Sequence, residues 1–181
     1  RPVVNCKRPD AALASGRAAR PDGGRMPEGR GRITQGNGSP MLLFMSPNSP
    51  FARKVMVLIQ EAGLSADVQL QAVTGSPIVP GSLPVDHNPL GKIPSLLLGD
   101  GRSIYDSRVI CRYLDDRAGG GFYPKAPALW DVLTLEATAD GIADAAVLMA
   151  YELRLRPENS RFPEWIEAQW AKITRALDMI A

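Results

Sequence analysis

The pattern of apolar and polar positions predicts a small sheet in the first half of the ordered chain. Residues 41–45 are a short apolar run, which is typical of a buried strand. Residues 67–73 alternate strictly between polar and apolar, which predicts a second strand with one buried face. Residues 94–98 and 102–105 flank a Gly-Asp-Gly turn, so their spacing predicts a β-hairpin.

Two helices are predicted within the same region. Pro50 stands where a helix places its first residue, so Ser49 becomes its N-cap, and Gly63 ends it. Asp106 and Ser107 open the second helix, which stops at three consecutive glycines. The residues expected to face inward from this second helix are Val109, Ile110, Tyr113 and Leu114.

Beyond a linker at 122–126, the pattern is wholly helical. One long helix is expected from Pro127 to about Leu155, and Pro163 opens another. The last helix carries an apolar stripe that must pack on another surface: Ile166, Trp170, Ile173, Leu177 and Ile180. Two helices alone make a poor domain, so we expect this helical part to be incomplete.

Composition and charge separate a basic N-terminal segment from the rest. The chain has 181 residues and a net charge of +2, with 21 Lys and Arg against 19 Asp and Glu. Residues 1–40 hold eight of the basic residues and three of the acidic ones, together with seven Gly and five Pro and no aromatic residue. Such a segment cannot bury enough surface to order itself, so we interpret it as a disordered extension or as read-through from a misplaced start. An RNA-binding arm and a transit peptide are the alternatives, and both lack supporting features.

Three local motifs carry a family resemblance. Residues 49–55, Ser-Pro-Phe-Ala-Arg-Lys-Val, follow the first strand, and residues 88–94 read Asn-Pro-Leu-Gly-Lys-Ile-Pro. Asp106 and Ser107 open the next helix. In this order and spacing the chain resembles the cytosolic glutathione S-transferases, of a serine type similar to bacterial members and C-terminally truncated. The resemblance implies an α/β thioredoxin-like domain at 41–119, which binds glutathione, followed by a partial all-α domain at 126–181.

The resemblance makes Ser49 the catalytic candidate. Conjugation needs the thiolate of glutathione, and a free thiol with a pKa of about 8.5 is only about 3% ionised at pH 7. A hydroxyl donor at a helix N-terminus supplies one hydrogen bond to sulfur and the positive end of the helix dipole. Ser46 also follows the first strand and is the other candidate, and an N-cap that only satisfies its own helix is the structural alternative for Ser49.

The resemblance also assigns five glutathione-binding residues. It implies that the Ile93–Pro94 bond is cis and that Ile93 pairs its main chain with the cysteinyl unit, whereas from sequence alone trans is the default. Lys92 would face the glycyl carboxylate. Ser107, at a helix N-terminus, suits the γ-glutamyl carboxylate, and Asp106 suits the ammonium. Both Asp106 and Ser107 are also ordinary helix-capping residues.

The few Cys and His residues limit the chemistry further. Residues 49 and 52 are Ser and Ala at the positions where glutaredoxins carry a redox Cys pair, so disulfide exchange at this turn is excluded. Cys111 is expected to serve packing, and Cys6 lies in the basic segment. His87, in the Pro-rich loop, is expected to be exposed, although it could approach the glycyl end.

The functional hypothesis is a glutathione transferase in which Ser49 stabilises the thiolate for attack on a small electrophile. Glutathione is a co-substrate, and neither a cofactor nor a metal is required. A cytoplasmic homodimer is expected, with no nucleic acid and no membrane as partner. The alternative is a transferase-fold module that binds glutathione or a protein without efficient catalysis.

Overall fold

The computed structural model describes residues 40–181, which belong to one compact unit of the chain. The expected basic extension over residues 1–40, with Cys6, therefore lies outside the described residues except for Pro40. The RNA-binding and transit-peptide alternatives concern the same segment, so they too lie outside the described part of the chain.

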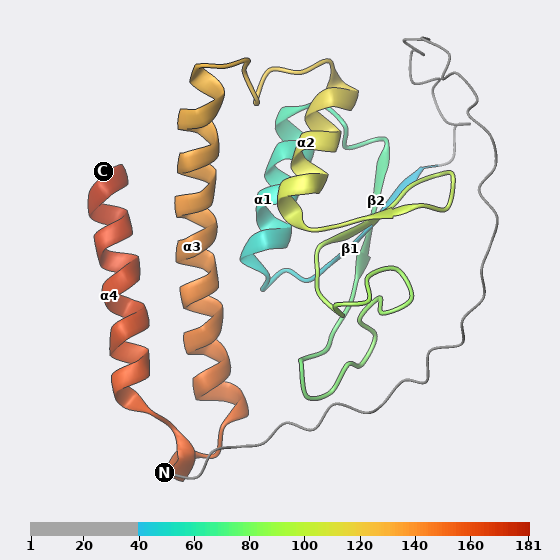
Figure 1. The fold of residues 1–181 in the computed structure, drawn as a ribbon. Helices are drawn as coiled ribbons and strands as arrows, with labels where there is room; N and C mark the ends of the chain where they lie inside the picture. The colour runs from blue at the N-terminus through green and yellow to red at the C-terminus, as the bar shows by residue number, and fades with distance from the viewer. Residues whose placement is uncertain (1–39) are drawn as a thin grey trace, which may run out of the picture. The chain divides into compact units, whose positions relative to one another are not determined.

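A four-stranded sheet forms the centre of the first half (Figure 1). Its strands are β1 (Met41–Met45), β2 (Val68–Ala72), β3 (Ser95–Leu97) and β4 (Ser103–Ile104), in the order β2-β1-β3-β4. Strand β1 runs parallel to β2 and antiparallel to β3, and β3 and β4 make the expected hairpin. The parallel pair is joined by a helix, which is the crossover that parallel strands require.

Two helices, α1 (Pro50–Glu61) and α2 (Ser107–Ala118), pack against each other beside the sheet (Figure 1). Both begin where the sequence predicts, because Ser49 and Asp106 cap their first turns and Gly119 ends α2 with a positive φ of 100°. The hydrophobic core lies between these helices and β1, with Leu43, Val55 and Ile110 fully buried. We call β1–β4, α1 and α2 the sheet region.

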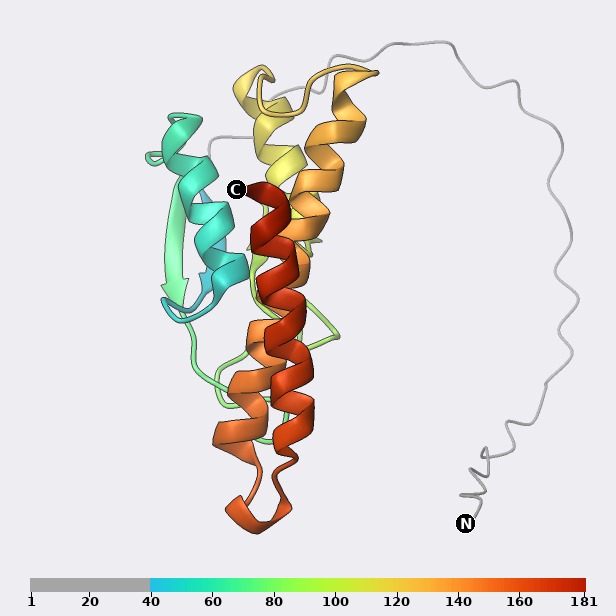
Figure 2. The ribbon, with the colours of Figure 1, turned by 90° about the vertical axis from the view of Figure 1, so that its left-hand side faces the viewer.

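The second half is helical. Helix α3 (Ala128–Leu155) lies alongside α1, and after a 3-10 turn, η1 (Glu158–Ser160), the chain returns as α4 (Pro163–Ile180). Figures 1 and 2 both show α3 and α4 side by side and antiparallel, and α4 lies on the side of α3 away from the sheet region. We call α3 and α4 the helical pair. Among residues 40–181, no helix combines the length and apolar character needed to cross a bilayer.

The expected burial is wrong at several positions. Leu70 is 51% exposed, because β2 is an edge strand of the sheet and only Val68 within it is buried. Val109 is 48% exposed on α2, where the buried positions are Ser107, Ile110, Cys111, Leu114 and Asp115. In the apolar stripe of α4 only Ile173 is buried, because this helix contacts α3 through the face that also carries Gln169. Trp170 and Leu177 remain exposed.

Candidate functional site

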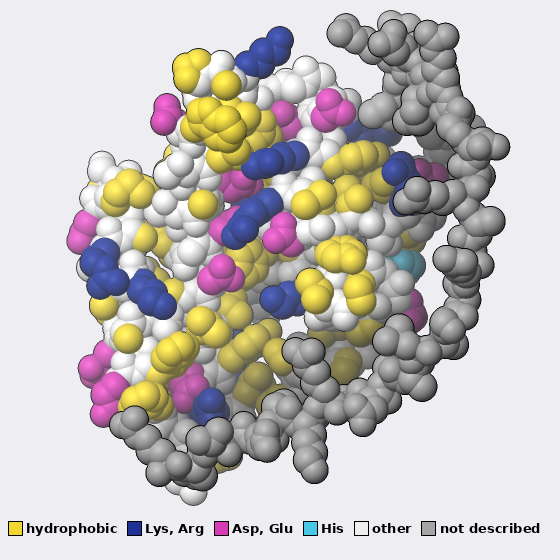
Figure 3. All heavy atoms as spheres, in the orientation of Figure 1, with side chains coloured by type: hydrophobic (Ala, Val, Ile, Leu, Met, Phe, Trp, Pro, Cys, Tyr) yellow, Lys and Arg dark blue, Asp and Glu magenta, His cyan; other side chains and the backbone are white. Residues whose placement is uncertain are grey.

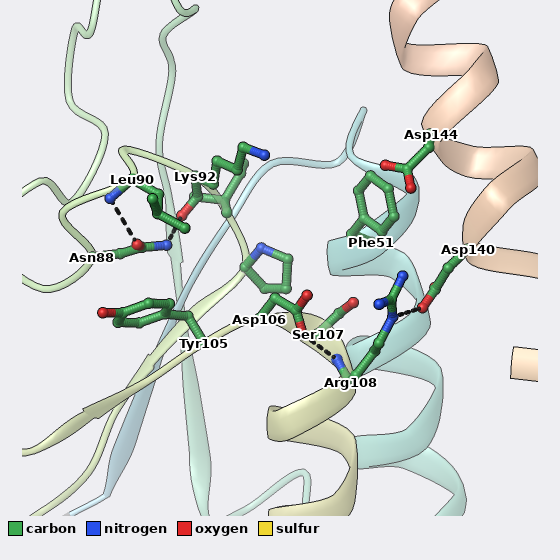
Figure 4. Close-up of a pocket in the computed structure, with 12 residues that line it drawn as sticks. Phe51, Asn88, Leu90, Lys92, Tyr105, Asp106, Ser107, Arg108, Asp140 and Asp144 are labelled. Carbon is green, nitrogen blue, oxygen red and sulfur yellow. Dashed lines mark hydrogen bonds and ion pairs between the residues drawn. The ribbon is translucent and has the colours of Figure 1, made fainter. Parts of the chain in front are cut away.

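A cavity of about 240 Å³ collects most of the predicted site residues. Five of the six line it: Lys92, Ile93, Pro94, Asp106 and Ser107. Its other lining residues come from α1, the loop before β3, the link between β4 and α2, α2 itself and α3: Phe51, Asn88, Leu90, Tyr105, Arg108, Asp140 and Asp144. Figure 4 shows Lys92, Asp106 and Ser107 on one side of the cavity and Phe51 and Asp144 on the other.

The loop at 88–94 is held in place by the buried amide of Asn88. Its Nδ2 donates to the carbonyl oxygen of Lys92 at 2.8 Å, and its Oδ1 accepts from the backbone N–H of Leu90 at 3.0 Å. Gly91 has a φ of +58°, which favours glycine at that position. The Ile93–Pro94 peptide bond is cis, as the resemblance implies. Asn88 thus fixes the backbone that presents Lys92 and Ile93 to the cavity.

The N-terminus of α2 lines the cavity next to this loop. Asp106 is exposed, and its Oδ1 accepts from the backbone N–H of Arg108 at 3.0 Å. Ser107 is buried at the first position of the helix. The positive end of the helix dipole therefore lies at the cavity, an arrangement that favours a bound carboxylate.

Ser49 lies at the N-terminus of α1 but does not line the cavity, although Phe51 of the same first turn does. Its Oγ accepts from the backbone N–H of Ala52 at 3.2 Å, so Ser49 is a side-chain N-cap. A hydroxyl can donate its hydrogen while its oxygen accepts a hydrogen bond from an amide, so capping leaves the O–H available to donate to a thiolate. Ser46 Oγ accepts from the backbone N–H of Asn48 at 3.4 Å and lies outside the cavity as well.

An ionic cluster borders the cavity where α3 meets α1 and α2. The buried carboxylate of Asp140 accepts from Lys54 Nζ at 2.8 Å and from Arg108 Nε at 2.6 Å. One turn away, Glu136 accepts from Lys54 Nζ at 3.2 Å and from the Tyr123 hydroxyl at 2.8 Å. Figure 3 shows cationic and acidic side chains interleaved along this seam. The cluster joins three helices through charge-assisted hydrogen bonds.

Burial and pairing shift three pKa values near the seam. The hydrogen bond that Arg108 donates to Asp140 raises the pKa of Arg108, so this guanidinium stays charged. Burial, followed by the hydrogen bond to Glu136, raises the pKa of Tyr123. Burial raises the pKa of Cys111 to about 12, which keeps the thiol protonated at neutral pH. The place of Cys111 in the hydrophobic core confirms the expectation that it serves packing.

Sequence reasoning missed the contribution of α3 to the site. Glu136, Asp140 and Asp144 recur at intervals of four residues, which places them on one face of a helix. Like charges at this spacing destabilise an isolated helix, so the pattern was a signal that cations or a ligand face it. No group of three or more His, Cys, Asp or Glu side chains within the described residues is arranged to hold a metal ion.

His87 is not the exposed loop residue that we expected. Its ring stacks on Phe44 with a centroid separation of 5.1 Å, and its Nδ1 lies 3.3 Å from Ser103 Oγ. It does not line the cavity.

Comparisons with known proteins agree with this architecture. Residues 48–117 match the family model of the glutathione S-transferase N-terminal domain. The chain is 31% identical over 142 residues to the uncharacterised GST-like protein YibF of Escherichia coli K12, an alignment that covers 77% of this chain and 68% of YibF. A glutathione transferase family member from Pseudomonas fluorescens Pf-5, solved with bound glutathione, is 47% identical to this chain with a TM-score of 0.75. The match covers 77% of this chain and 69% of the Pseudomonas chain.

Another Pseudomonas fluorescens Pf-5 structure is 46% identical to this chain with a TM-score of 0.70, and the match covers 77% of this chain and 68% of the other. It holds S-(propanoic acid)-glutathione. The thioredoxin-like sheet followed by a helical region is thus the fold that these relatives share with the chain. The chain belongs to the glutathione S-transferase family.

Proposed function

We propose that this protein is a glutathione transferase that binds glutathione in the cavity and stabilises its thiolate for attack on a small electrophile. The observation that carries the proposal is the convergence of Lys92, Ile93, Pro94, Asp106 and Ser107 on one cavity beside the capped N-terminus of α1. The bound glutathione of a relative 47% identical to this chain supports the ligand.

Each end of glutathione has a matching group in this cavity. Lys92 faces the glycyl carboxylate, and the main chain of Ile93 before Pro94 pairs with the cysteinyl unit as an added strand. The N-terminus of α2 with Ser107 receives the γ-glutamyl carboxylate, while Asp106 receives the ammonium. Ser107 is buried and Asp106 exposed, which suits a fixed contact to the carboxylate and a solvated one to the ammonium.

In this proposal Ser49 is the catalytic residue. Its hydroxyl donates a hydrogen bond to the thiolate while its oxygen still accepts the hydrogen bond from the Ala52 N–H. The positive end of the α1 dipole stabilises the negative charge on sulfur further. Lowering the thiol pKa by about two units corresponds to about 2.7 kcal/mol of stabilisation and makes the thiolate the major form at pH 7. We further propose a cytoplasmic homodimer acting in detoxification.

Conjugation of a chloronitrobenzene electrophile by the full chain tests this mechanism. Ser49→Ala should lower the rate about tenfold or more while glutathione binding, measured by calorimetry, is retained. Ser46→Ala is the matched control and should stay within about twofold of the wild type. A Ser49→Ala rate equal to that of the wild type would remove Ser49 from the mechanism and direct attention to Ser46.

A second candidate function is glutathione binding without efficient catalysis. It is favoured by one observation, that Ser49 lies beside the cavity and not among its lining residues. Under this alternative glutathione binds, yet the wild-type chain conjugates the electrophile no faster than free glutathione does. Sedimentation velocity on the same preparation checks the proposed dimer.

A further inference from the structure

Helix α3 carries its three aligned carboxylates toward the sheet region, and two of them are neutralised there. Asp140 is 3% exposed and pairs with both Lys54 and Arg108. Glu136 is 11% exposed and pairs with Lys54, with Arg112 4.0 Å away. Three cations of α1 and α2 thus lie against the first two carboxylates of this row.

Asp144 is the third carboxylate of the row. It is exposed, and within residues 40–181 it has no salt-bridge partner. It nevertheless lines the cavity. Figure 4 shows its carboxylate beside the Phe51 ring, across the cavity from Lys92. The helical pair therefore contributes to the cavity one carboxylate that forms no salt bridge within the described residues, and its charge acts on Arg108 of the same cavity only at longer range.

The proposed function, on which this inference rests, leaves Asp144 without a role in binding the tripeptide. Glutathione carries two carboxylates and one ammonium, and these are matched by Lys92, by the N-terminus of α2 and by Asp106. Asp144 instead shares its side of the cavity with Phe51, in the first turn of the helix that Ser49 caps. The Ser49 hydroxyl is proposed to donate a hydrogen bond to the sulfur of glutathione. The electrophile, which becomes attached to that sulfur, therefore lies nearer to Phe51 and Asp144 than the rest of the tripeptide does.

We propose that Asp144 and Phe51 form a subsite for the electrophile that selects positively charged substrates over neutral ones and disfavours anionic ones. A carboxylate attracts a cation and repels an anion through the same Coulomb interaction. The face of an aromatic ring adds a favourable contact for an ammonium or guanidinium group. Carboxylate and ring together thus recognise one chemical class, a small electrophile that carries a cation.

Binding of three S-substituted glutathiones tests this subsite without requiring catalysis. The compounds share the tripeptide and differ in the charge on the S-ethyl group: a trimethylammonium, a carboxamide and a carboxylate, the last being S-(propanoic acid)-glutathione. In calorimetry with the wild-type chain, the cationic compound should bind about fivefold more tightly than the neutral one, and the anionic compound about fivefold more weakly. Free glutathione is measured alongside.

Variants of the two residues complete the test. Asp144→Asn should bring the three affinities within about twofold of one another, and Phe51→Leu should reduce the preference for the cation about twofold. Asp131→Asn removes the same charge from an exposed position on the same helix, outside the cavity, and should keep the wild-type order.

Several results would overturn the proposal, and they separate it from the proposed function. If free glutathione binds but the three adducts bind equally, or the anionic one binds most tightly, only the subsite is wrong. If Asp144→Asn weakens free glutathione as much as the cationic adduct, Asp144 contacts the ammonium of the tripeptide and not the electrophile. If free glutathione does not bind at all, the glutathione site and the subsite fail together.

Discussion

The sheet region and the helical pair bury different kinds of side chain. The hydrophobic core lies wholly between residues 41 and 114, where Leu43, Leu96 and Leu114 are completely buried. In the helical pair the buried apolar side chains are Ala145 and Ile173, whereas Asp140, Glu152 and Gln169 are buried polar ones. Large apolar side chains such as Trp130 and Trp170 are more than half exposed there.

This difference indicates that the two regions are stabilised by different forces. Burial of apolar surface dominates the sheet region. The helical pair is attached to it largely through the Lys54, Arg108, Asp140 and Glu136 cluster, whose members must be paired because buried charges are costly when alone. The wall of the cavity that the sheet region forms thus rests on a buried apolar core, and the α3 wall of the cavity rests on ion pairs.

The largest expected effect concerns the reactivity of Cys111. Burial raises its pKa from 9.0 to about 12, so its thiolate is about a thousandfold rarer at pH 8 than that of an exposed thiol. In a Cys6→Ser background, alkylation of Cys111 should be negligible in the native state, while an added Ala139→Cys on the exposed face of α3 should react readily. Peptide mapping by mass spectrometry measures both, and equal labelling would contradict a tightly packed sheet region.

Truncation of a core side chain should have the next largest effect. Leu43→Ala leaves a cavity among the sheet and two helices, and it should lower the free energy of unfolding by about 3 kcal/mol. Leu177→Ala is the matched change in α4, where the side chain is 46% exposed, and should cost less than about 0.5 kcal/mol. Urea denaturation gives both values, and similar losses for the two variants would remove the contrast between the regions.

Asp140→Asn tests the ionic attachment. It keeps the shape of the side chain but leaves Arg108 without its carboxylate and Lys54 with Glu136 alone, at a cost of about 2 kcal/mol in the free energy of unfolding. Asp131→Asn, at an exposed position of the same helix, should stay within about 0.5 kcal/mol of the wild type. An Asp140→Asn variant as stable as the wild type would show that other contacts hold α3.

The smallest effect is a pH dependence within the helical pair. Desolvation raises the pKa of Glu152, but the Phe162 N–H at 3.0 Å and Arg156 Nε at 2.7 Å outweigh it, so the net shift is downward from 4.5. A lowered pKa means that the ionised carboxylate stabilises the fold above about pH 4.5, and that this contribution is lost as the pH falls through the lowered pKa.

The variant Glu152→Gln, which removes the charge of this carboxylate, tests the pH dependence. Its stability should lie below that of the wild type at pH 7, by less than for Asp140→Asn, and the two stabilities should converge at acidic pH. Thermal melts across this range measure the difference, and a gap that persists unchanged at pH 3 would assign the effect to packing.

The sequence predicted those features that depend on neighbouring residues. Ser49 before Pro50, and Asp106 before Ser107, specify helix starts through local hydrogen bonds, so both starts were confirmed. The thioredoxin-like order followed by helices was confirmed for the same reason, since turns and periodicity are local. The cavity then brought together all of the residues predicted to bind glutathione.

Features that depend on distant residues were missed. Asp140 pairs with Lys54 across 86 positions in the chain, and no local pattern indicates which cation an acidic helix face will meet. The exposure of Leu70, Val109 and Trp170 depends on which element covers each face, and their periodicity alone is compatible with burial. Asp144 belongs to the same class, because its place at the cavity follows from how α3 lies against α1 and α2.

The ionisation of bound glutathione tests the central claim most directly. The ultraviolet absorbance of the thiolate is titrated against pH for glutathione bound to the wild-type chain, to Ser49→Ala and to Ser46→Ala. We expect an apparent pKa about two units below the free value of about 8.5 for the wild type and for Ser46→Ala, and a return toward the free value for Ser49→Ala. A thiol that ionises at the free value in the wild type, or equally in all three proteins, would contradict the account.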